Sequence, residues 1–170
     1  HCVSRVVDRR FAFQAVEKEK LRMFMRMYEN FSGCRVLSYC LMCNHIHILL
    51  EVTPVPVGGL SDEALLGRLR AIYHEAFVAE VAKELAEARK LVAAGRGAES
   101  VLVGRIHERF TYRMHDLSEF MKTLLQRFTR WHNSRTKRLG NLWEETFKSV
   151  VVEDGLASKT MAAYIDLNPV

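Results

Sequence analysis

Apolar positions along this chain recur with two periods, and each period predicts a different kind of element. Between residues 14 and 31 they fall at helical spacing and Gly33 supplies a stop, so we predict an amphipathic helix there. Residues 35–41 and 45–52 are short apolar runs of the kind found in strands, with Cys43 and Asn44 as a tight connection. The pattern therefore predicts a helix followed by an antiparallel hairpin.

The middle of the chain predicts helices. Two prolines and two glycines make residues 53–59 a loop, because neither a strand nor a helix continues easily through them. A helical stretch begins at Ser61 and runs, with an interruption, to about Val92, and residues 93–100 form a flexible link. We predict that residues 60–114 are a mostly helical insertion.

The last third of the chain predicts a long helix, a strand and a final helix. Asp116 and Glu119 fit a D-x-x-E capping box, and the apolar residues that follow trace one helix face as far as Trp131. After this helix we expect a basic turn at residues 133–141, a strand at 147–153, and a helix that starts at Asp154–Gly155 and ends at Asn168, before Pro169.

The order of these elements indicates the fold class. Residues 1–7 alternate weakly and predict a first strand, so the order is β-α-β-β, the helical insertion, and then α-β-α. This order is typical of an antiparallel sheet covered by helices. We expect a single α+β domain that covers residues 1–170.

The composition agrees with a globular domain, since 49% of the residues are hydrophobic and 26% are charged. No run approaches the roughly 18 apolar residues that a membrane helix needs, and no secretion signal opens the chain. We therefore expect a soluble, intracellular protein with no membrane partner. The four cysteines, at positions 2, 34, 40 and 43, are expected to be reduced and mostly buried.

Positive charge is concentrated in one part of the chain. The formal net charge is +5, and residues 105–138 carry nine lysines and arginines against three acids. Such a stretch favours a polyanion as partner, although many basic proteins bind nothing acidic.

His45 and His47 form an H-x-H motif in the second predicted hairpin strand. Side chains alternate along a strand, so both imidazoles share one face while Ile46 and Ile48 point to the other. Two neutral imidazoles make half of a divalent-metal site. A surface pair without a ligand is the simpler alternative. A structural zinc site with Cys43 is another, but Cys40 is expected on the opposite face.

Tyr164 and Asn168 are spaced i, i+4 on the last predicted helix, so they lie on one face about a turn apart. A phenol and an amide oxygen would be presented together there. Taken alone, Tyr164 is equally an amphipathic core residue and Asn168 an ordinary helix end before proline.

Three separated blocks of the sequence are familiar: LMCNHIHILLEV (41–52), NLWEETFKSVVVED (141–154) and AAYIDLNPV (162–170). In their order and spacing they resemble the single-strand tyrosine transposases of the HUH superfamily, most closely those associated with REP elements. The combination is far more specific than any one block. The resemblance covers about two thirds of the chain and leaves residues 60–114 outside it.

This resemblance implies a site and a chemistry. His45 and His47 would bind the metal with Asn168 as third ligand, and Tyr164 would be the nucleophile that forms a 5′-phosphotyrosine intermediate. The cofactor would be Mg²⁺ or Mn²⁺. The substrate would be single-stranded or hairpin DNA and no small molecule, cleaved and rejoined by a monomer or a homodimer in the bacterial cytoplasm, with the nucleoid. The family fold is a ferredoxin-like or RRM-like antiparallel sheet with helices on one face.

DNA phosphates would be held by the basic stretch and one lysine beyond it, with Trp131, Trp143 and Phe147 as stacking groups. Core packing is the alternative role that we favour for Trp143 and Phe147. The basic residues in question are Arg105, Arg109, Arg113, Lys122, Arg127, Arg130, Arg135, Lys137, Arg138 and Lys148.

The sequence departs from the family pattern at two positions. Thr146 stands where arginine is usual, and Cys43 stands where a small residue or proline is usual. A lost phosphate contact would suit a DNA-hairpin-binding regulator with weak or no cleavage, whereas the complete set of two histidines, tyrosine and asparagine favours the enzyme. An RNA-binding domain of RRM-like shape is a third alternative, but the predicted strands carry no RNP-like aromatic pair.

Overall fold

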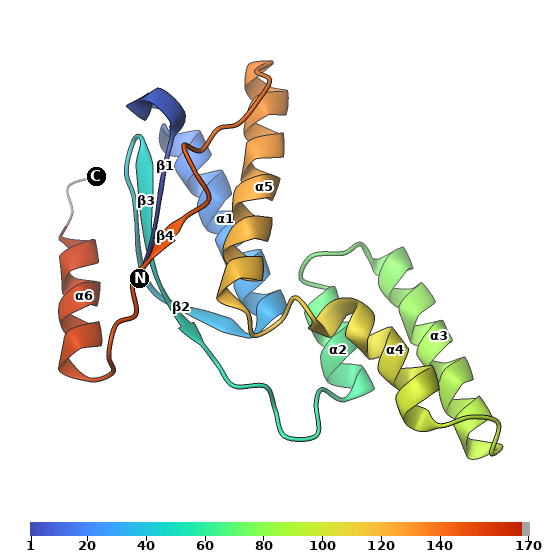
Figure 1. Ribbon diagram of the computed structural model, residues 1–170. Coiled ribbons are helices and arrows are strands. Elements are labelled where there is room, and N and C mark those ends of the chain that lie inside the picture. Colours follow the sequence, from blue (N-terminus) through green and yellow to red (C-terminus); the bar gives the residue numbers. More distant parts are fainter. Residues whose placement is uncertain (168–170) are drawn as a thin grey trace.

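The computed structural model describes residues 1–167, and its centre is a four-stranded sheet (Figure 1). The strands are β1 (Cys2–Arg5), β2 (Cys34–Leu41), β3 (His45–Val52) and β4 (Lys148–Ser149), in the order β2-β3-β1-β4. All three pairings are antiparallel. The expected α+β class with an antiparallel sheet is therefore confirmed.

Two long helices, α1 (Ala15–Ser32) and α5 (Leu117–Thr136), pack together on one face of the sheet, which we call the core face. The predicted cap of α5 is present, since the Asp116 carboxylate accepts from the Glu119 backbone N–H at 2.7 Å. Fully buried Phe128 packs edge-on against Phe13, with ring centroids 5.4 Å apart. Large rings interdigitating in this way build the main core.

The alternation of β3 assigns its two sets of side chains to different environments. Ile46 and Ile48 are fully buried on the core face. His45 and His47 therefore point to the opposite face, which we call the histidine face. Helix α6 (Leu156–Asp166) contacts β2 and β3 and lies alone on the left of Figure 1, away from α1 and α5. The resemblance implied helices on one face of the sheet, and α6 is an additional helix that partly covers the other face.

The helices expected between residues 60 and 114 are present as α2 (Asp62–Leu69), α3 (Glu75–Ala93) and α4 (Glu99–Thr111). They form a separate lobe beside the sheet layer (Figure 1). Their apolar faces meet at buried residues such as Leu65, Val81 and Val103. The interpretation of this lobe as an insertion stays a prediction.

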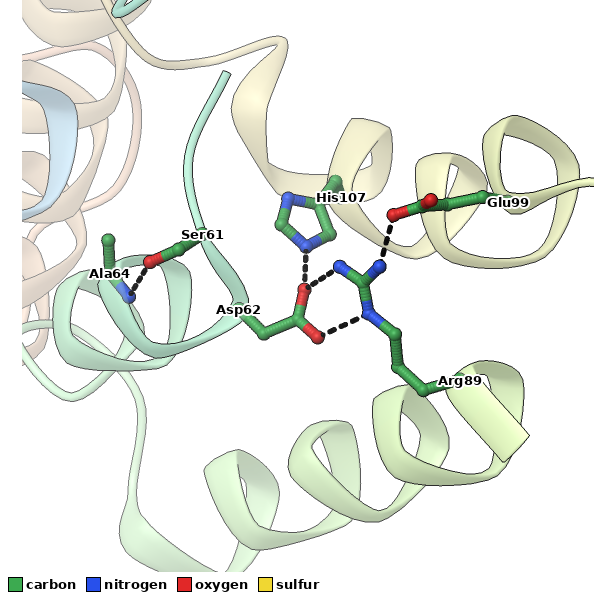
Figure 2. Close-up of polar contacts among 6 residues, drawn as sticks. All are labelled: Ser61, Asp62, Ala64, Arg89, Glu99 and His107. Carbon is green, nitrogen blue, oxygen red and sulfur yellow. Dashed lines mark hydrogen bonds and ion pairs between the residues drawn. The ribbon is translucent and has the colours of Figure 1, made fainter. Parts of the chain in front are cut away.

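A polar cluster joins the three helices of the lobe (Figure 2). The Arg89 guanidinium donates to both oxygens of Asp62 at 2.9 Å and also contacts Glu99, while His107 Nε2 lies 2.7 Å from an Asp62 oxygen. The hydrogen bond from Arg89, helped by the one from His107, lowers the pKa of Asp62 from 3.8 to about 2. The Asp62 carboxylate thus ties α2 to α3 and α4.

We expect Asp62→Asn to lower the free energy of unfolding at neutral pH, because it removes the carboxylate charge that Arg89 contacts. The loss should be only roughly 1 kcal/mol, since solvent screens part of this contact. A carboxylate whose pKa is lower in the folded than in the unfolded state stabilises the fold at pH values above its unfolded-state pKa. This stabilisation is lost as the pH falls through the folded-state pKa. The difference between parent and variant should therefore shrink from about pH 4 to about pH 2 in urea titrations. Glu87→Gln, which breaks an exposed contact to Lys90, is the control and should change little. Equal stability of parent and Asp62→Asn at pH 5 would refute this assignment.

A polar joint between the lobe and the sheet layer lies where Gly33, Thr53 and His115 come together. Thr53 Oγ1 donates to the Gly33 carbonyl at 2.5 Å, and His115 Nδ1 lies 2.8 Å from the Thr53 carbonyl. Because that carbonyl only accepts, Nδ1 carries the proton, and Nε2 can accept from Arg68 Nη1 at 3.1 Å. The chain therefore leaves the sheet layer and returns to it at the same point.

Gly33 ends α1 in the left-handed conformation, with φ of 75°. A Cβ there would lie 2.6 Å from His115 Cε1 and 2.8 Å from Arg68 Nη1. We expect Gly33→Ala to cost about 3 kcal/mol, because left-handed strain and overpacking add. Gly95 has φ of 70° and open space around it, so Gly95→Ala should cost only about 1 kcal/mol. Urea denaturation of both variants separates strain from steric overlap, and equal losses would contradict the proposed packing of the joint.

Two element boundaries differ from those predicted. The strand expected at residues 147–153 is only Lys148–Ser149, because β4 is an edge strand that pairs with β1 at two positions; Val150 and Val151 are exposed instead. Helix α5 continues through the start of the expected basic turn and ends at Thr136, where Lys137 turns left-handed. Among residues 1–167, no helix is long and apolar enough to cross a membrane.

Candidate functional site

Strand register brings a row of side chains together across the histidine face. His47 is paired with Cys40 of β2 on one side and with Val3 of β1 on the other, and Val3 is paired with Lys148 of β4. Directly opposite residues of antiparallel strands point to the same face. Two residue pairs further along, and so on the same face, Arg5 is the partner of His45. Two imidazoles and two cationic side chains therefore share this surface.

The two imidazoles lie close together, with ring centroids 5.1 Å apart at an interplanar angle of 71°. Partial burial lowers the pKa of His45, and the nearby Arg5 charge lowers it further. Burial also lowers the pKa of His47, with His45 and Arg5 as further causes. Both rings are thus held neutral at neutral pH, which is the state in which an imidazole can bind a metal ion.

Each imidazole has a polar partner at Nδ1. His45 Nδ1 lies 2.7 Å from Asn44 Oδ1. His47 Nδ1 lies 3.0 Å from Nε2 of His1, whose ring stacks on His47 with an interplanar angle of 6°. A partner at one ring nitrogen orients the ring and leaves the other nitrogen for a ligand.

Helix α6 places Tyr164 beside these histidines. Ile165 is fully buried against Cys40 and Leu49, and the Ser38 hydroxyl donates to Asp166 at 2.6 Å. These two neighbours anchor the end of α6 on β2 and β3. The Tyr164 ring lies edge-on to the His47 ring, with centroids 6.4 Å apart, and 55% of its surface is exposed. Three of the four residues predicted for the catalytic site are therefore neighbours.

The fourth predicted residue, Asn168, lies outside the described residues. Among residues 1–167 there is no group of three or more histidine, cysteine, aspartate or glutamate side chains suited to hold a metal. The donor set that is described consists of the two neutral imidazoles. They fit a divalent ion that takes part of its coordination from elsewhere, such as an amide oxygen, water or a substrate phosphate.

The histidine strands match a known family. Residues 1–56 match the family model described as Transposase IS200 like. The matched segment, here called the IS200-like segment, comprises 56 of the 170 residues. The match includes the first of the three sequence blocks and agrees with the resemblance of that block to the transposases. No curated protein matches the chain.

The IS200-like segment spans β1, α1, β2 and β3 and includes both histidines. It ends before α6, so Tyr164 and the sequence blocks at 141–154 and 162–170 lie beyond the matched range. The roles predicted for His45, His47 and Tyr164 remain predictions, although the fold places these residues together.

Cys40 corrects one expectation about this segment. It was expected opposite His45 and His47, but it is the cross-strand partner of His47 and is buried under α6. The expectation assumed that side chains alternate between faces without a break from Cys40 to His45. The chain reverses at residues 42–44, however, and begins a new strand. Burial raises the pKa of the Cys40 thiol, which suits a packed apolar side chain better than a zinc thiolate. Cys2, Cys34 and Cys40 are buried, as expected, and Cys43 is exposed.

The predicted DNA-binding residues do not form one surface with the IS200-like segment's histidines. Those on α4 and just after it belong to the lobe, where Arg109 pairs with Glu84, and Arg113 donates to the Tyr73 hydroxyl. Those on α5 lie beyond the core face, where Arg135 contacts Glu17. The remaining side chains are distributed along the same two helices and the turn that follows α5: Arg105, Lys122, Arg127, Arg130, Lys137 and Arg138.

Within this set, Lys122 and Arg130 line a cavity of about 770 Å³ between α5 and residues 141–149. The cavity also includes Phe147 and one edge of Trp143. Trp143 is only 8% exposed, and its Nε1 donates to Thr129 Oγ1 at 3.0 Å. The core role favoured for Trp143 is therefore confirmed. Lys148 is the one predicted DNA contact that shares the histidine face.

Sequence reasoning missed two residues of the site. Arg5 lies opposite His45, and it lines a hollow of about 300 Å³ together with Thr146 and Lys148. The strand alternation of residues 2–5 could have placed it on a face, but pairing with β3 is a tertiary fact. Asn44, predicted only as part of a turn, contacts His45 through its side chain.

Proposed function

We propose that this protein is a metal-dependent single-strand DNA endonuclease and strand transferase that acts through a 5′-phosphotyrosine at Tyr164. The observation that carries the proposal is the edge-on approach of Tyr164 to His47 within one chain. A nucleophile must lie within reach of the group that activates the phosphate. Here the anchoring of α6 by Ile165 and Asp166 supplies that proximity.

His45 and His47 would hold Mg²⁺ or Mn²⁺, with Asn168 as the proposed third ligand. Their lowered pKa values favour this role, because a neutral imidazole keeps a lone pair for the metal. When bound, the ion would polarise a non-bridging oxygen of the scissile phosphate. Arg5 and Lys148 lie on the same face and would attract the phosphodiester backbone to it.

The reaction balances without a further reactant. The Tyr164 oxygen forms a bond to phosphorus while the bond from phosphorus to the 3′ oxygen breaks, and the phenol proton is transferred to that oxygen. The products are a 5′-phosphotyrosine and a free 3′-hydroxyl. Attack by a 3′-hydroxyl on the phosphotyrosine reverses the step and reseals or joins strands. The energy of the phosphodiester bond is conserved in the covalent intermediate.

The substrate that we propose is hairpin DNA with an adjacent single strand, which the three-block resemblance to REP-associated transposases suggests. Basic residues on α5, with Lys122 and Arg130 at the edge of a cavity, would bind duplex phosphates away from the cleavage site. The active unit that we propose is a single chain or a homodimer, which the mass of the protein–DNA complex would distinguish.

The test is incubation of the protein with labelled hairpin DNA carrying single-stranded flanks, in the presence of Mg²⁺ or Mn²⁺. We expect a covalent protein–DNA adduct that survives SDS, together with a released strand that ends in a 3′-hydroxyl. Substrates are drawn from palindromic repeats of the source genome. Tight hairpin binding with no adduct on any substrate would replace the enzyme with the alternative, a hairpin-binding regulator.

A further inference from the structure

We propose that Asn44 is a positioning residue that fixes which ring nitrogen of His45 carries the proton. The Asn44 side chain bridges two groups: its Nδ2 donates to the Arg9 carbonyl at 3.1 Å, and its Oδ1 lies 2.7 Å from His45 Nδ1. These two contacts alone determine the tautomer. Its consequence for metal binding rests on the function proposed above.

The two contacts determine the orientation of the Asn44 amide. The Arg9 carbonyl can only accept, so the Asn44 atom that faces it must be the NH₂ group. The oxygen then faces His45, and because an amide oxygen has no proton to give, His45 Nδ1 must donate. Neutral His45 therefore carries its proton on Nδ1 and keeps its lone pair on Nε2. A flipped amide would place two acceptors, or two donors, against each other.

The backbone around Asn44 holds its carbonyl partner in place. Arg9 ends the short 3-10 helix η1 (Val7–Arg9), in which Asp8 and Arg9 both adopt positive φ, 59° and 52°. Such a conformation is strained for a residue other than glycine, so the surroundings must enforce it. Val6 N–H donates to the Asn44 carbonyl and Phe13 N–H to the Cys43 carbonyl, each at 2.9 Å. These bonds join the loop that precedes α1 to the turn that precedes β3.

His47 has no comparable constraint. Its Nδ1 partner is His1 Nε2, another imidazole nitrogen, which can donate or accept. A donor from His1 would put the His47 proton on Nε2, the nitrogen needed for a metal, whereas an acceptor would leave Nε2 free. Asn44, by contrast, allows only one arrangement at His45. The structure thus assigns His45 as the ligand whose proton position is fixed before a metal binds, and Asn44 as the residue that fixes it.

The first test uses the parent protein without metal. Nitrogen-15 NMR of the histidine rings distinguishes the tautomers of His45 directly, and we expect the Nδ1–H form to dominate above its pKa. A dominant Nε2–H form in the parent would overturn the proposal, and no variant is required for this result. In Asn44→Asp a carboxylate oxygen still accepts from Nδ1, so the tautomer should persist. In Asn44→Ala the acceptor is lost, and a mixture of both forms should appear.

The second test measures Mn²⁺ affinity by calorimetry, without DNA. We expect Asn44→Ala to weaken Mn²⁺ binding about 10- to 100-fold, the usual effect of losing a partner behind a ligating histidine, and Asn44→Asp to weaken it less. Asn133→Ala is the matched control, since it removes an amide that donates to the Gly140 carbonyl at 2.8 Å, remote from the histidines. Unchanged Mn²⁺ affinity in Asn44→Ala, with a changed tautomer, would overturn the metal consequence.

The two tests separate this inference from the proposed function. If the parent forms no DNA adduct yet shows the Nδ1–H tautomer and loses it in Asn44→Ala, the role of Asn44 stands and the nickase does not. If the adduct forms but the tautomer is independent of Asn44, the reverse holds.

Discussion

Tyr164→Phe is expected to abolish the covalent DNA adduct while leaving the fold and hairpin binding intact. Phenylalanine keeps the ring that lies edge-on to His47 and removes only the oxygen that would attack phosphorus. More than half of the Tyr164 side chain is exposed, so its substitution should not disturb the core. Adduct formation is measured on denaturing gels, and binding by the mobility of labelled hairpin DNA in native gels.

The matched control for this substitution is Tyr112→Phe. Tyr112 is also exposed, at 67%, but it lies in the lobe at the end of α4, so its variant should form the adduct at the parental rate. An adduct that persists in Tyr164→Phe would move the nucleophile to another tyrosine. Tyr28 is buried and Tyr73 accepts from Arg113, which leaves Tyr39 and Tyr112 as the next residues to test.

His45→Ala and His47→Ala are each expected to reduce the rate of adduct formation on the order of 10³-fold. A bound divalent ion stabilises the charge that develops on the phosphate by several kcal/mol, and about 1.4 kcal/mol corresponds to a factor of ten in rate. Each variant should also lose most of its Mn²⁺ affinity in calorimetry without DNA. The double variant should be little worse than either single one, because the two imidazoles act as a unit.

His74→Ala provides the control for loss of an imidazole. His74 caps α3 through Nδ1 in the lobe, so its removal should affect stability slightly and Mn²⁺ binding not at all. Parental rates in both His45→Ala and His47→Ala would show that the pair is a surface feature with no ligand, the alternative that the motif alone left open.

The sequence was informative wherever local periodicity decides the structure. A period of two along β3 was sufficient to place His45 and His47 together and Ile46 in the core. The capping box at Asp116 correctly marked the start of α5. In both cases the deciding interactions lie within a few residues of one another along the chain.

Prediction was wrong or silent where the outcome depends on pairing between distant segments. The length of β4 is limited by the number of β1 residues that pair with it. The face of the sheet to which Cys40 points depends on where the hairpin turns. The position of α6 on the histidine face depends on contacts such as that between Ser38 and Asp166, 128 residues apart. The basic residues at 105–138 are contiguous in sequence, yet two helices in different parts of the molecule divide them.

The joint between Thr53 and His115 has a consequence for how much sequence the lobe can hold. Since the two ends of the excursion already meet through a 2.8 Å hydrogen bond, the lobe is a closed loop that is attached to the sheet layer at this joint and packs against it through α1 and α2. The entropy of closing such a loop grows with the logarithm of its length, so doubling the number of residues adds only about 0.6 kcal/mol. Residues can therefore be gained or lost between these two positions with little effect on the strands that carry the histidines. The segment that this joint closes is thus the part of the chain whose length can vary most easily.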